Sequence, residues 1–226
     1  MSVLSNPFWH ALTTEQAAFA VVDGLLRSFP RDVTPFCAVE RDGEAVGAGA
    51  LRAAMAGAAV RHFAGRLPDL PSGFRSGRPI TLLQMACAHM ADAGGTTVVR
   101  DLSLEHVDSM LELTGTVFPG FFRRRTIEMG RYLGVFEAGA LVAMGGERLA
   151  LPGYRELSAI CTHPSHAGKG YGRTIVRGLA TRIFSEDRVP FLHVRDTNLS
   201  ARGLYESLGF TVVNTVPLLT VSAESV

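Results

Sequence analysis

The stretch AICTHPSHAGKGYGR, residues 159–173, decides the fold. It starts as a strand-like run, turns at Pro164 and then places glycine at every second position, at Gly168, Gly170 and Gly172. Because glycine tolerates positive φ, such a run curls tightly and can point successive backbone N–H groups into one concavity. A helical pattern to about Phe184 follows, and a helix N-terminus adds partial positive charge. Together these features predict a site for a pyrophosphate.

Three interpretations of this loop compete with that of a specific coenzyme site. A P-loop requires GxxxxGK followed by Ser or Thr, and residues 159–173 lack this spacing. A dinucleotide fingerprint requires GxGxxG after the first strand of a βαβ unit. Here Arg173 occupies the third glycine position, and the loop follows the fourth expected strand of its block. A plain glycine-rich turn that binds no ligand stays open.

The segments around the loop predict a mixed α/β domain. Turns at residues 137–140 and 151–153 separate three strand-like runs before the loop, so we expect antiparallel hairpins there. After the loop the pattern predicts helix, strand, helix and strand. The expected elements of this block are a strand at Thr97–Leu102, a helix capped by Ser103, a short helix at Thr126–Leu133, strands at Gly134–Glu137, Leu141–Ala150 and Tyr154–Thr162, the helix to about Phe184, a strand at Phe191–Val194, a helix at Asn198–Leu208 and a strand at Phe210–Val221.

Residues 1–93 form a separate compositional block, and the glycine-rich segment Asp92–Gly95 is the best boundary. We therefore predict an N-terminal α/β appendage at 1–93 and a second domain at 94–226. The first block carries no chemical motif, so we expect it to pack against the second and shape its acceptor side. Its expected elements are a helix from Thr13 to Leu26, a strand at Pro35–Glu40, a helix at Ala45–Ala56, strands at Val60–Phe63 and Thr81–Ala88, and a loop at Leu67–Pro79.

Composition excludes several classes of function. The 226 residues are 47% hydrophobic and 19% charged, which suits a large buried core. The formal net charge is +1, so we expect neither nucleic acid nor a membrane surface as a partner. The three cysteines, Cys37, Cys87 and Cys161, form no CxxC and predict neither disulfides nor a metal site. The N-terminus lacks a signal-peptide pattern, so we expect a cytoplasmic protein without a metal.

The loop resembles the coenzyme A signature of the GNAT (general N-acetyltransferase) superfamily, Arg/Gln-x-x-Gly-x-Gly/Ala, aligned at residues 167–172. A second likeness follows at the distance seen in that superfamily. It consists of Asn198, Ala201, Tyr205 and the sequence Leu-Gly-Phe at residues 208–210. The two motifs flank the expected helix and strand, and the likeness covers roughly residues 97–221. One departure is Ala167, which stands where the superfamily has Arg or Gln, so a side-chain contact to the coenzyme is in question.

The resemblance implies the GNAT acyl-CoA N-acyltransferase fold, a mixed and mostly antiparallel sheet flanked by helices. It implies an N-acetyltransferase that moves an acetyl group from acetyl-CoA, its co-substrate, to a primary amine. It also implies a bulge in the strand before the loop and a splay from the next strand. The residues that it places along the coenzyme are Ile160, Cys161, Thr162, Gly168, Lys169, Gly170, Tyr171, Gly172, Arg173 and Asn198.

Two further residues are candidates for the chemistry. Tyr205 resembles the general acid that protonates the departing thiolate, although it is also compatible with a packed helix tyrosine. Glu156 resembles the strand glutamate of protein-lysine acetyltransferases and is our candidate base, although a solvent-facing glutamate fits as well. The resemblance also places the segment Phe118–Phe122 on the substrate side, where simple core packing is the alternative.

The acceptor itself stays undetermined at this stage. Peptide N-termini, lysines, polyamines and amino sugars all remain, and so does a homodimer. The sequence leaves two rival functions open, a catalytically weak acyl-CoA-binding regulatory module and a different nucleotide-binding α/β enzyme.

Overall fold

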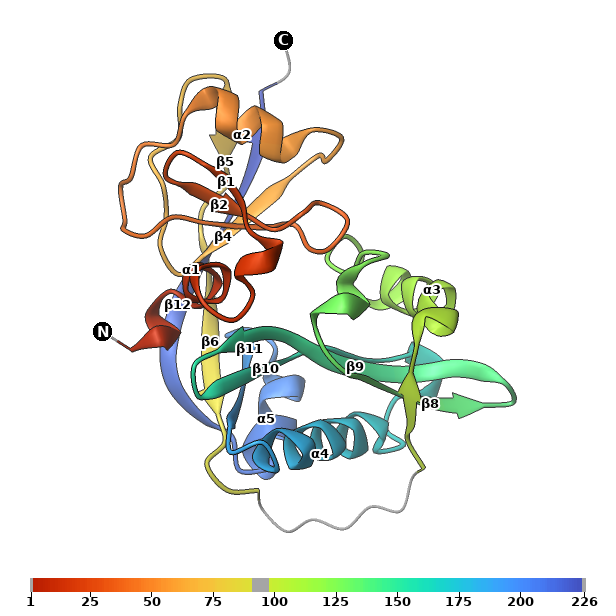
Figure 1. Ribbon diagram of the computed structural model, residues 1–226. Helices are drawn as coiled ribbons and strands as arrows, with labels where there is room; N and C mark the ends of the chain where they lie inside the picture. The colour runs from red at the N-terminus through yellow and green to blue at the C-terminus, as the bar shows by residue number, and fades with distance from the viewer. Residues whose placement is uncertain (1, 91–97, 225–226) are drawn as a thin grey trace.

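A computed structural model describes residues 2–90 and 98–224 (Figure 1). One mixed sheet runs through these residues in the order β1-β2-β3-β4-β12-β6-β11-β10-β9-β8-β7, with β5 paired to β12. Its strands are β1 (Val21–Asp23), β2 (Leu26–Ser28), β3 (Phe36–Ala38), β4 (Arg61–Ala64), β5 (Phe74–Ser76), β6 (Ile80–Ala86), β7 (Arg100–Leu102), β8 (Tyr132–Glu137), β9 (Ala140–Leu151), β10 (Tyr154–Thr162), β11 (Val189–Arg195) and β12 (Thr211–Ala223). The α-helices are α1 (Pro7–Thr13), α2 (Ala48–Met55), α3 (Val107–Val117), α4 (Tyr171–Phe184) and α5 (Leu199–Ser207).

Most of the predicted elements of the second block are confirmed. Strands β8, β9 and β10 form two antiparallel hairpins, as the turn signals indicated. Helix α4 follows the glycine loop and buries a regular apolar stripe, in which Ile175, Leu179 and Ile183 have no exposed surface. Helices α4 and α3 cover opposite faces of the β8–β10 strands, because each supplies one apolar stripe to a separate core cluster.

The predicted helix from Thr13 to Leu26 is wrong. Helix α1 ends at Thr13, after starting with Pro7 at its first position, where a missing N–H costs nothing. In the sequence, Thr13 and Gln16 have the spacing of a capping box. In the structure, the side chain of Gln16 instead donates to the backbone oxygen of Arg148 at 2.7 Å. The apolar run toward Leu26 forms a 3₁₀ turn at Ala17–Phe19 and then the hairpin of β1 and β2. A local pattern was overridden here by tertiary contacts.

Two shorter segments also differ from expectation. The expected loop at Leu67–Pro79 contains β5, which pairs with β12. The expected short helix at Thr126–Leu133 is a single 3₁₀ turn, Thr126–Met129, and β8 begins at Tyr132.

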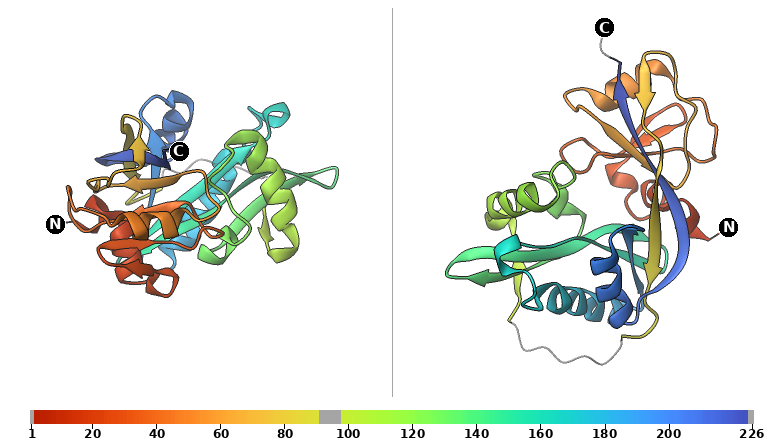
Figure 2. Two further views of the ribbon diagram at one scale, coloured as in Figure 1. Left: turned by 90° about the horizontal axis from the view of Figure 1, so that it is seen from above. Right: turned by 180° about the vertical axis from the view of Figure 1, so that it is seen from behind.

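The N-terminal residues do not build a sheet of their own. Strand β6 lies between β11 and β12, and β12 continues past β6 to pair with β4 and β5 (Figure 2). A shared core joins the two blocks, with Phe8, Phe29 and Phe36 packed in the same cluster as Leu149 and Phe191. The expected packing of the two blocks is therefore confirmed. The boundary segment Asp92–Gly95 lies outside the described residues, and the division at residue 93 stays a prediction.

None of the helices in residues 2–90 and 98–224 combines the length and the apolar character needed to cross a bilayer.

Candidate active site

The site begins where β10 and β11 separate. The two strands pair in parallel only from Tyr154 to Leu157, although both continue beyond that point. On its other edge, β10 shifts register against β9 between Ser158 and Cys161, and Ala159 has a φ of 55°. This pattern is a β-bulge with a residue in the left-handed region. The bulge and the splay that the resemblance implied are both present.

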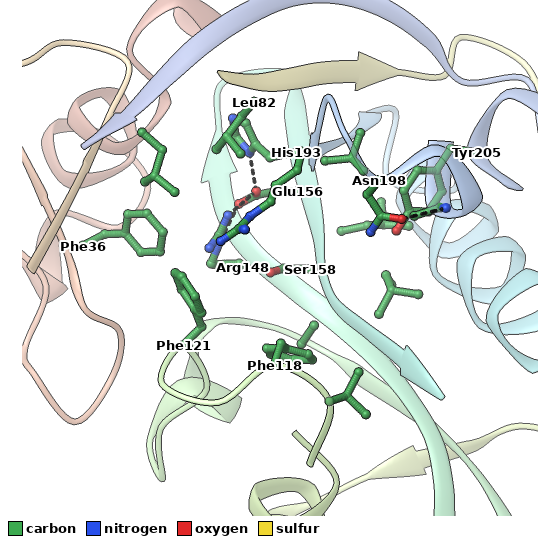
Figure 3. A pocket seen from close by; sticks show the side chains of 18 of the residues that line it. Phe36, Leu82, Phe118, Phe121, Arg148, Glu156, Ser158, His193, Asn198 and Tyr205 are labelled. Carbon is green, nitrogen blue, oxygen red and sulfur yellow. Dashed lines mark hydrogen bonds and ion pairs between the residues drawn. The ribbon is translucent and has the colours of Figure 1, made fainter. Parts of the chain in front are cut away.

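A cavity of about 530 Å³ fills the splayed region (Figure 3). Its walls fall into three parts. Aromatic side chains of Phe36, Phe118 and Phe121 form one side, and Asn198 and Tyr205 from the α5 region form the opposite side. A charged group lies between the two sides and is made of Arg148, Glu156 and His193. The cavity therefore joins the sequence-predicted coenzyme residues to an apolar compartment.

The charged group is a buried hydrogen-bonded network. Arg148 on β9 donates to both oxygens of Glu156 on β10, from Nε to Oε2 at 2.9 Å and from a terminal nitrogen to Oε1 at 2.5 Å. His193 Nδ1 on β11 lies 2.6 Å from the same Oε1. The side chain of Glu156 is 1% exposed and that of Arg148 is 14% exposed. Charges this deep are tolerated in proteins only when they are paired in this way.

Two amides extend the network and set the histidine tautomer. Asn214 Nδ2 donates to Gln84 Oε1 at 3.0 Å, which leaves Gln84 Nε2 facing His193 Nε2 at 3.0 Å. The amide nitrogen must then donate, so His193 Nε2 accepts and its proton sits on Nδ1. The Nδ1–H in turn donates to Glu156. The chain of bonds therefore runs across β12, β6, β11, β10 and β9.

The network fixes the charge of Glu156. Burial alone would raise the pKa of this carboxyl and is the largest single effect. The positive charge of Arg148, the electrostatic attraction of His193 and the hydrogen bonds from both residues together outweigh it. The pKa of Glu156 is consequently lowered to about 2. A carboxylate with so low a pKa takes up protons poorly at neutral pH.

Arg148 is held on its other side by aromatic rings from the N-terminal block. Its guanidinium lies 5.1 Å from the ring centroid of Phe8 and 4.8 Å from that of Phe36. Both distances suit cation–π attraction, which strengthens when the cation is desolvated. Residues before position 93 thus line the cavity through Phe36 and Leu82, and the buried Gln84 supports it through its contact with His193.

Asn198 and Tyr205 lie on the same wall, as their spacing of two helical turns indicated. Asn198 caps α5, because its Oδ1 accepts from the backbone N–H of Ala201 at 3.1 Å. Burial raises the pKa of the Tyr205 hydroxyl to about 12. The nearby Cys161 thiol is affected in the same direction, and burial raises its pKa to about 12.

The glycine loop leads directly into α4. Gly168 and Gly170 have φ values of 81° and 82°, which disfavour any other residue. Among the described residues, no protein acceptor bonds the backbone N–H groups of residues 168–172, and nothing lies within 4 Å of a Cβ added at Gly168 or Gly170. These amides therefore stand open at the start of a helix, as an anion site requires.

The other predicted coenzyme residues are distributed on both sides of the bulge. Ile160 lines the cavity, whereas the Cys161 side chain points into the opposite core cluster beneath α3. Thr162 continues the pairing of β10 with β9. Lys169 Nζ binds Glu137 at 2.9 Å, and Arg173 donates to Ser207 at 2.8 Å. The side chains of Lys169 and Arg173 are therefore both engaged by other residues of the protein.

Arg148, His193 and Gln84 were missed by sequence reasoning. One signal was available for Arg148, since a charged residue within the apolar run Leu141–Leu151 requires a buried partner, and Glu156 is the matching charge on the next strand. No comparable signal existed for Gln84 or His193, because their strands become neighbours only in the folded sheet.

Comparisons with known proteins agree with this architecture. The sequence model of the family described as FR47-like protein matches residues 132–217. No curated protein matches the chain at a significant level. Among solved structures, one from Novosphingobium aromaticivorans DSM 12444, assigned to the GNAT family of acetyltransferases, superposes with a TM-score of 0.85. The two sequences are 26% identical, and the match covers 100% of both chains.

Two more distant structures show the same fold. A GCN5-related N-acetyltransferase from Kribbella flavida has a TM-score of 0.59 at 14% identity, over 96% of both chains. A GCN5-related N-acetyltransferase-like protein from Streptococcus suis 89/1591 has a TM-score of 0.58 at 11% identity, over 96% of this chain and 93% of the other. The chain therefore has the GNAT fold predicted from its glycine loop, a mixed α/β sheet flanked by helices.

Proposed function

We propose that this chain is an N-acetyltransferase that moves the acetyl group of acetyl-CoA to a primary amine. The observation that carries the proposal is the continuity of β10. This strand lines the cavity through Glu156 and Ser158, opens at the bulge and then leads into the unpaired amides of the glycine loop. A thioester that entered along this path would bring a reactive carbonyl beside the cavity and a pyrophosphate to the start of α4. The likeness to GNAT acetyltransferases adds independent support.

The proposed reaction is attack of a neutral amine on the thioester carbonyl. The developing oxyanion needs a hydrogen-bond donor, and a backbone N–H at the bulge is the candidate. The departing thiolate needs a proton, for which Tyr205 on the coenzyme wall is the candidate. Its pKa of about 12 keeps the hydroxyl protonated at neutral pH.

Glu156 remains a proposed site residue, with a role different from that of a free base. Its carboxylate is engaged by Arg148 and by the Nδ1–H of His193. We propose that it positions both groups at the centre of the cavity and holds the histidine in one tautomer. An amine that enters in its neutral form still loses one proton as the amide forms. That proton is left to water, and it balances the proton that the departing thiolate takes up.

A catalytically weak acyl-CoA-binding module is the second candidate, and Ala167 is the observation that favours it. A methyl side chain there cannot supply the contact that Arg or Gln would make.

The surroundings of the three cysteines support the predicted cytoplasmic location, because all three are unpaired and buried.

The test combines binding with turnover. Acetyl-CoA, NAD and ATP are added separately in a thermal-shift assay, and only acetyl-CoA is expected to raise Tm. Thiol release from acetyl-CoA is then followed with a panel of amines. Amine-dependent release supports the acetyltransferase, binding without release supports the weak module, and stabilisation by NAD or ATP alone would refute both.

A further inference from the structure

We infer that the acceptor is an α-amino group whose own residue has an aromatic or branched apolar side chain, presented as a peptide N-terminus or as an amino-acid amide. This inference rests on the proposed acetyltransferase function and narrows its acceptor. Three features of the cavity support it.

The first feature is the apolar wall opposite the coenzyme side. Phe36, Phe118 and Phe121 face the cavity from two different parts of the chain (Figure 3). Phe121 is held in place by stacking on His62, with ring centroids 4.8 Å apart and planes 18° apart. Leu82, Val117 and Leu218 complete this wall. A wall of this kind selects an apolar body, because each apolar surface that it covers is removed from water.

The second feature is the balance of charge around the cavity. Of the described residues that line it, Arg148 and Arg195 are cationic and Glu156 is the only carboxylate. That carboxylate is already neutralised by Arg148. A polyamine or a polycationic amino sugar would bring several positive charges into a cavity that offers them no counter-ion. Such acceptors are therefore disfavoured by desolvation and by like-charge repulsion.

The third feature is that Glu156 and His193, the candidate bases in the cavity, are poorly able to accept a proton. The network engages Glu156 and both nitrogens of His193, so the amine must enter largely in its neutral form. An α-amino group of a peptide has a pKa of about 7.8, whereas that of a lysine side chain is about 10.4. At pH 7.5 about a third of the α-amino group is neutral, against about a thousandth of the lysine amine. The difference of more than a hundredfold favours the α-amino group.

The experiment uses acceptors matched in pairs. Phenylalaninamide and phenethylamine share an aromatic body but differ in amine pKa, and phenylalaninamide and glycinamide share an α-amino amide but differ in side chain. Nα-acetyl-lysinamide and spermidine represent the disfavoured classes, and the peptide Phe-Gly-Gly tests a peptide N-terminus against the small amide. We expect kcat/KM for phenylalaninamide or Phe-Gly-Gly to exceed that for each of the other four by about tenfold or more.

A variant at Val117 tests the second feature together with the first, because Val117 is part of the apolar wall. Val117 is 38% exposed at the cavity rim, so Val117→Glu adds a carboxylate without burying it. This variant should shift the ratio of kcat/KM for spermidine over phenylalaninamide upward by about tenfold. Val22→Glu is the control, because Val22 is 57% exposed and lies in β1, outside the cavity lining. The control should leave the ratio unchanged.

The outcomes separate this inference from the proposed function. If acetyl-CoA fails to bind in calorimetry, the proposed acetyltransferase function is refuted. If acetyl-CoA binds and spermidine or Nα-acetyl-lysinamide is the better acceptor, the inference alone is overturned. Binding of acetyl-CoA with turnover of glycinamide equal to that of phenylalaninamide would also overturn it, since the aromatic wall would then select nothing.

Discussion

Replacing Glu156 by Gln tests how much the buried network stabilises the folded protein. The substitution keeps the shape of the side chain and removes its charge, which leaves Arg148 without a counter-ion between Phe8 and Phe36. Breaking a buried ion pair from one side typically costs about 3 to 5 kcal/mol. Arg148 keeps 14% of its surface exposed, so water offsets part of that cost and we expect the lower end, about 3 kcal/mol.

The pKa of Glu156 leads to a similar value for its contribution to the stability of the fold. A fall from 4.5 to about 2 corresponds to roughly 3 kcal/mol of preference for the charged form in the folded protein. Because the folded pKa lies below the unfolded one, this stabilisation is present above pH 4.5 and is lost as the pH falls toward 2. The free energies of unfolding of the wild type and of Glu156→Gln should therefore show their full difference at pH 7, and this difference should shrink below about pH 4.5.

Urea denaturation from pH 7 to pH 3 measures this difference in the free energy of unfolding. Glu128→Gln is the matched control, because Glu128 forms an exposed ion pair with Arg125 and should cost at most about 1 kcal/mol. A double-mutant cycle with Arg148→Met should show a coupling of about 1 to 3 kcal/mol. A loss at pH 7 no larger than that of the control, or one that persists unchanged at pH 3, would refute the reasoning.

Three further predictions follow from the site. Tyr205→Phe removes only the hydroxyl on the coenzyme wall, so kcat should fall by about 10²-fold while acetyl-CoA affinity changes little. A wild-type kcat across the pH range would exclude Tyr205 as the general acid. Gly170→Val places a branched side chain at a φ of 82° beside the open amides. Calorimetry should then detect no acetyl-CoA binding while circular dichroism stays near wild type, and unchanged affinity would contradict the loop assignment. The fragment Gly94–Val226 lacks β6, which pairs with both β11 and β12, and is expected to be insoluble or inactive; a soluble fragment with full turnover would show the N-terminal block to be dispensable.

Much of the second block could be predicted from local patterns. The glycines at 168 and 170 adopt positive φ, and their positions before an amphipathic helix indicated the open loop at the start of α4. The hairpins β8–β9 and β9–β10 followed from alternation and turn residues, which act over a few positions. Asn198 and Tyr205 fall on one wall because two helical turns separate them. Each of these features depends on residues close together in the chain.

The N-terminal block was predicted less well for the same reason. The segment after Thr13 carries a helix-like pattern, yet Gln16 reaches the backbone of Arg148, 132 residues away in the sequence, and the chain turns into the β1–β2 hairpin. The position of β6 between β11 and β12 is likewise a matter of sheet order. Such pairings carry no local signal, because their free energy comes from apolar surface buried between distant segments.

The charged centre of the cavity was decided by the tertiary structure. Gln84 and His193 are 109 residues apart, and Glu156 and His193 are 37 apart, yet strand register brings their side chains within hydrogen-bond distance. That register also turns Glu156 from a candidate base into a paired carboxylate with a pKa of about 2. A side chain's type sets which reactions it can perform, but its charge depends on desolvation and on the groups around it, and those arise only when the strands assemble.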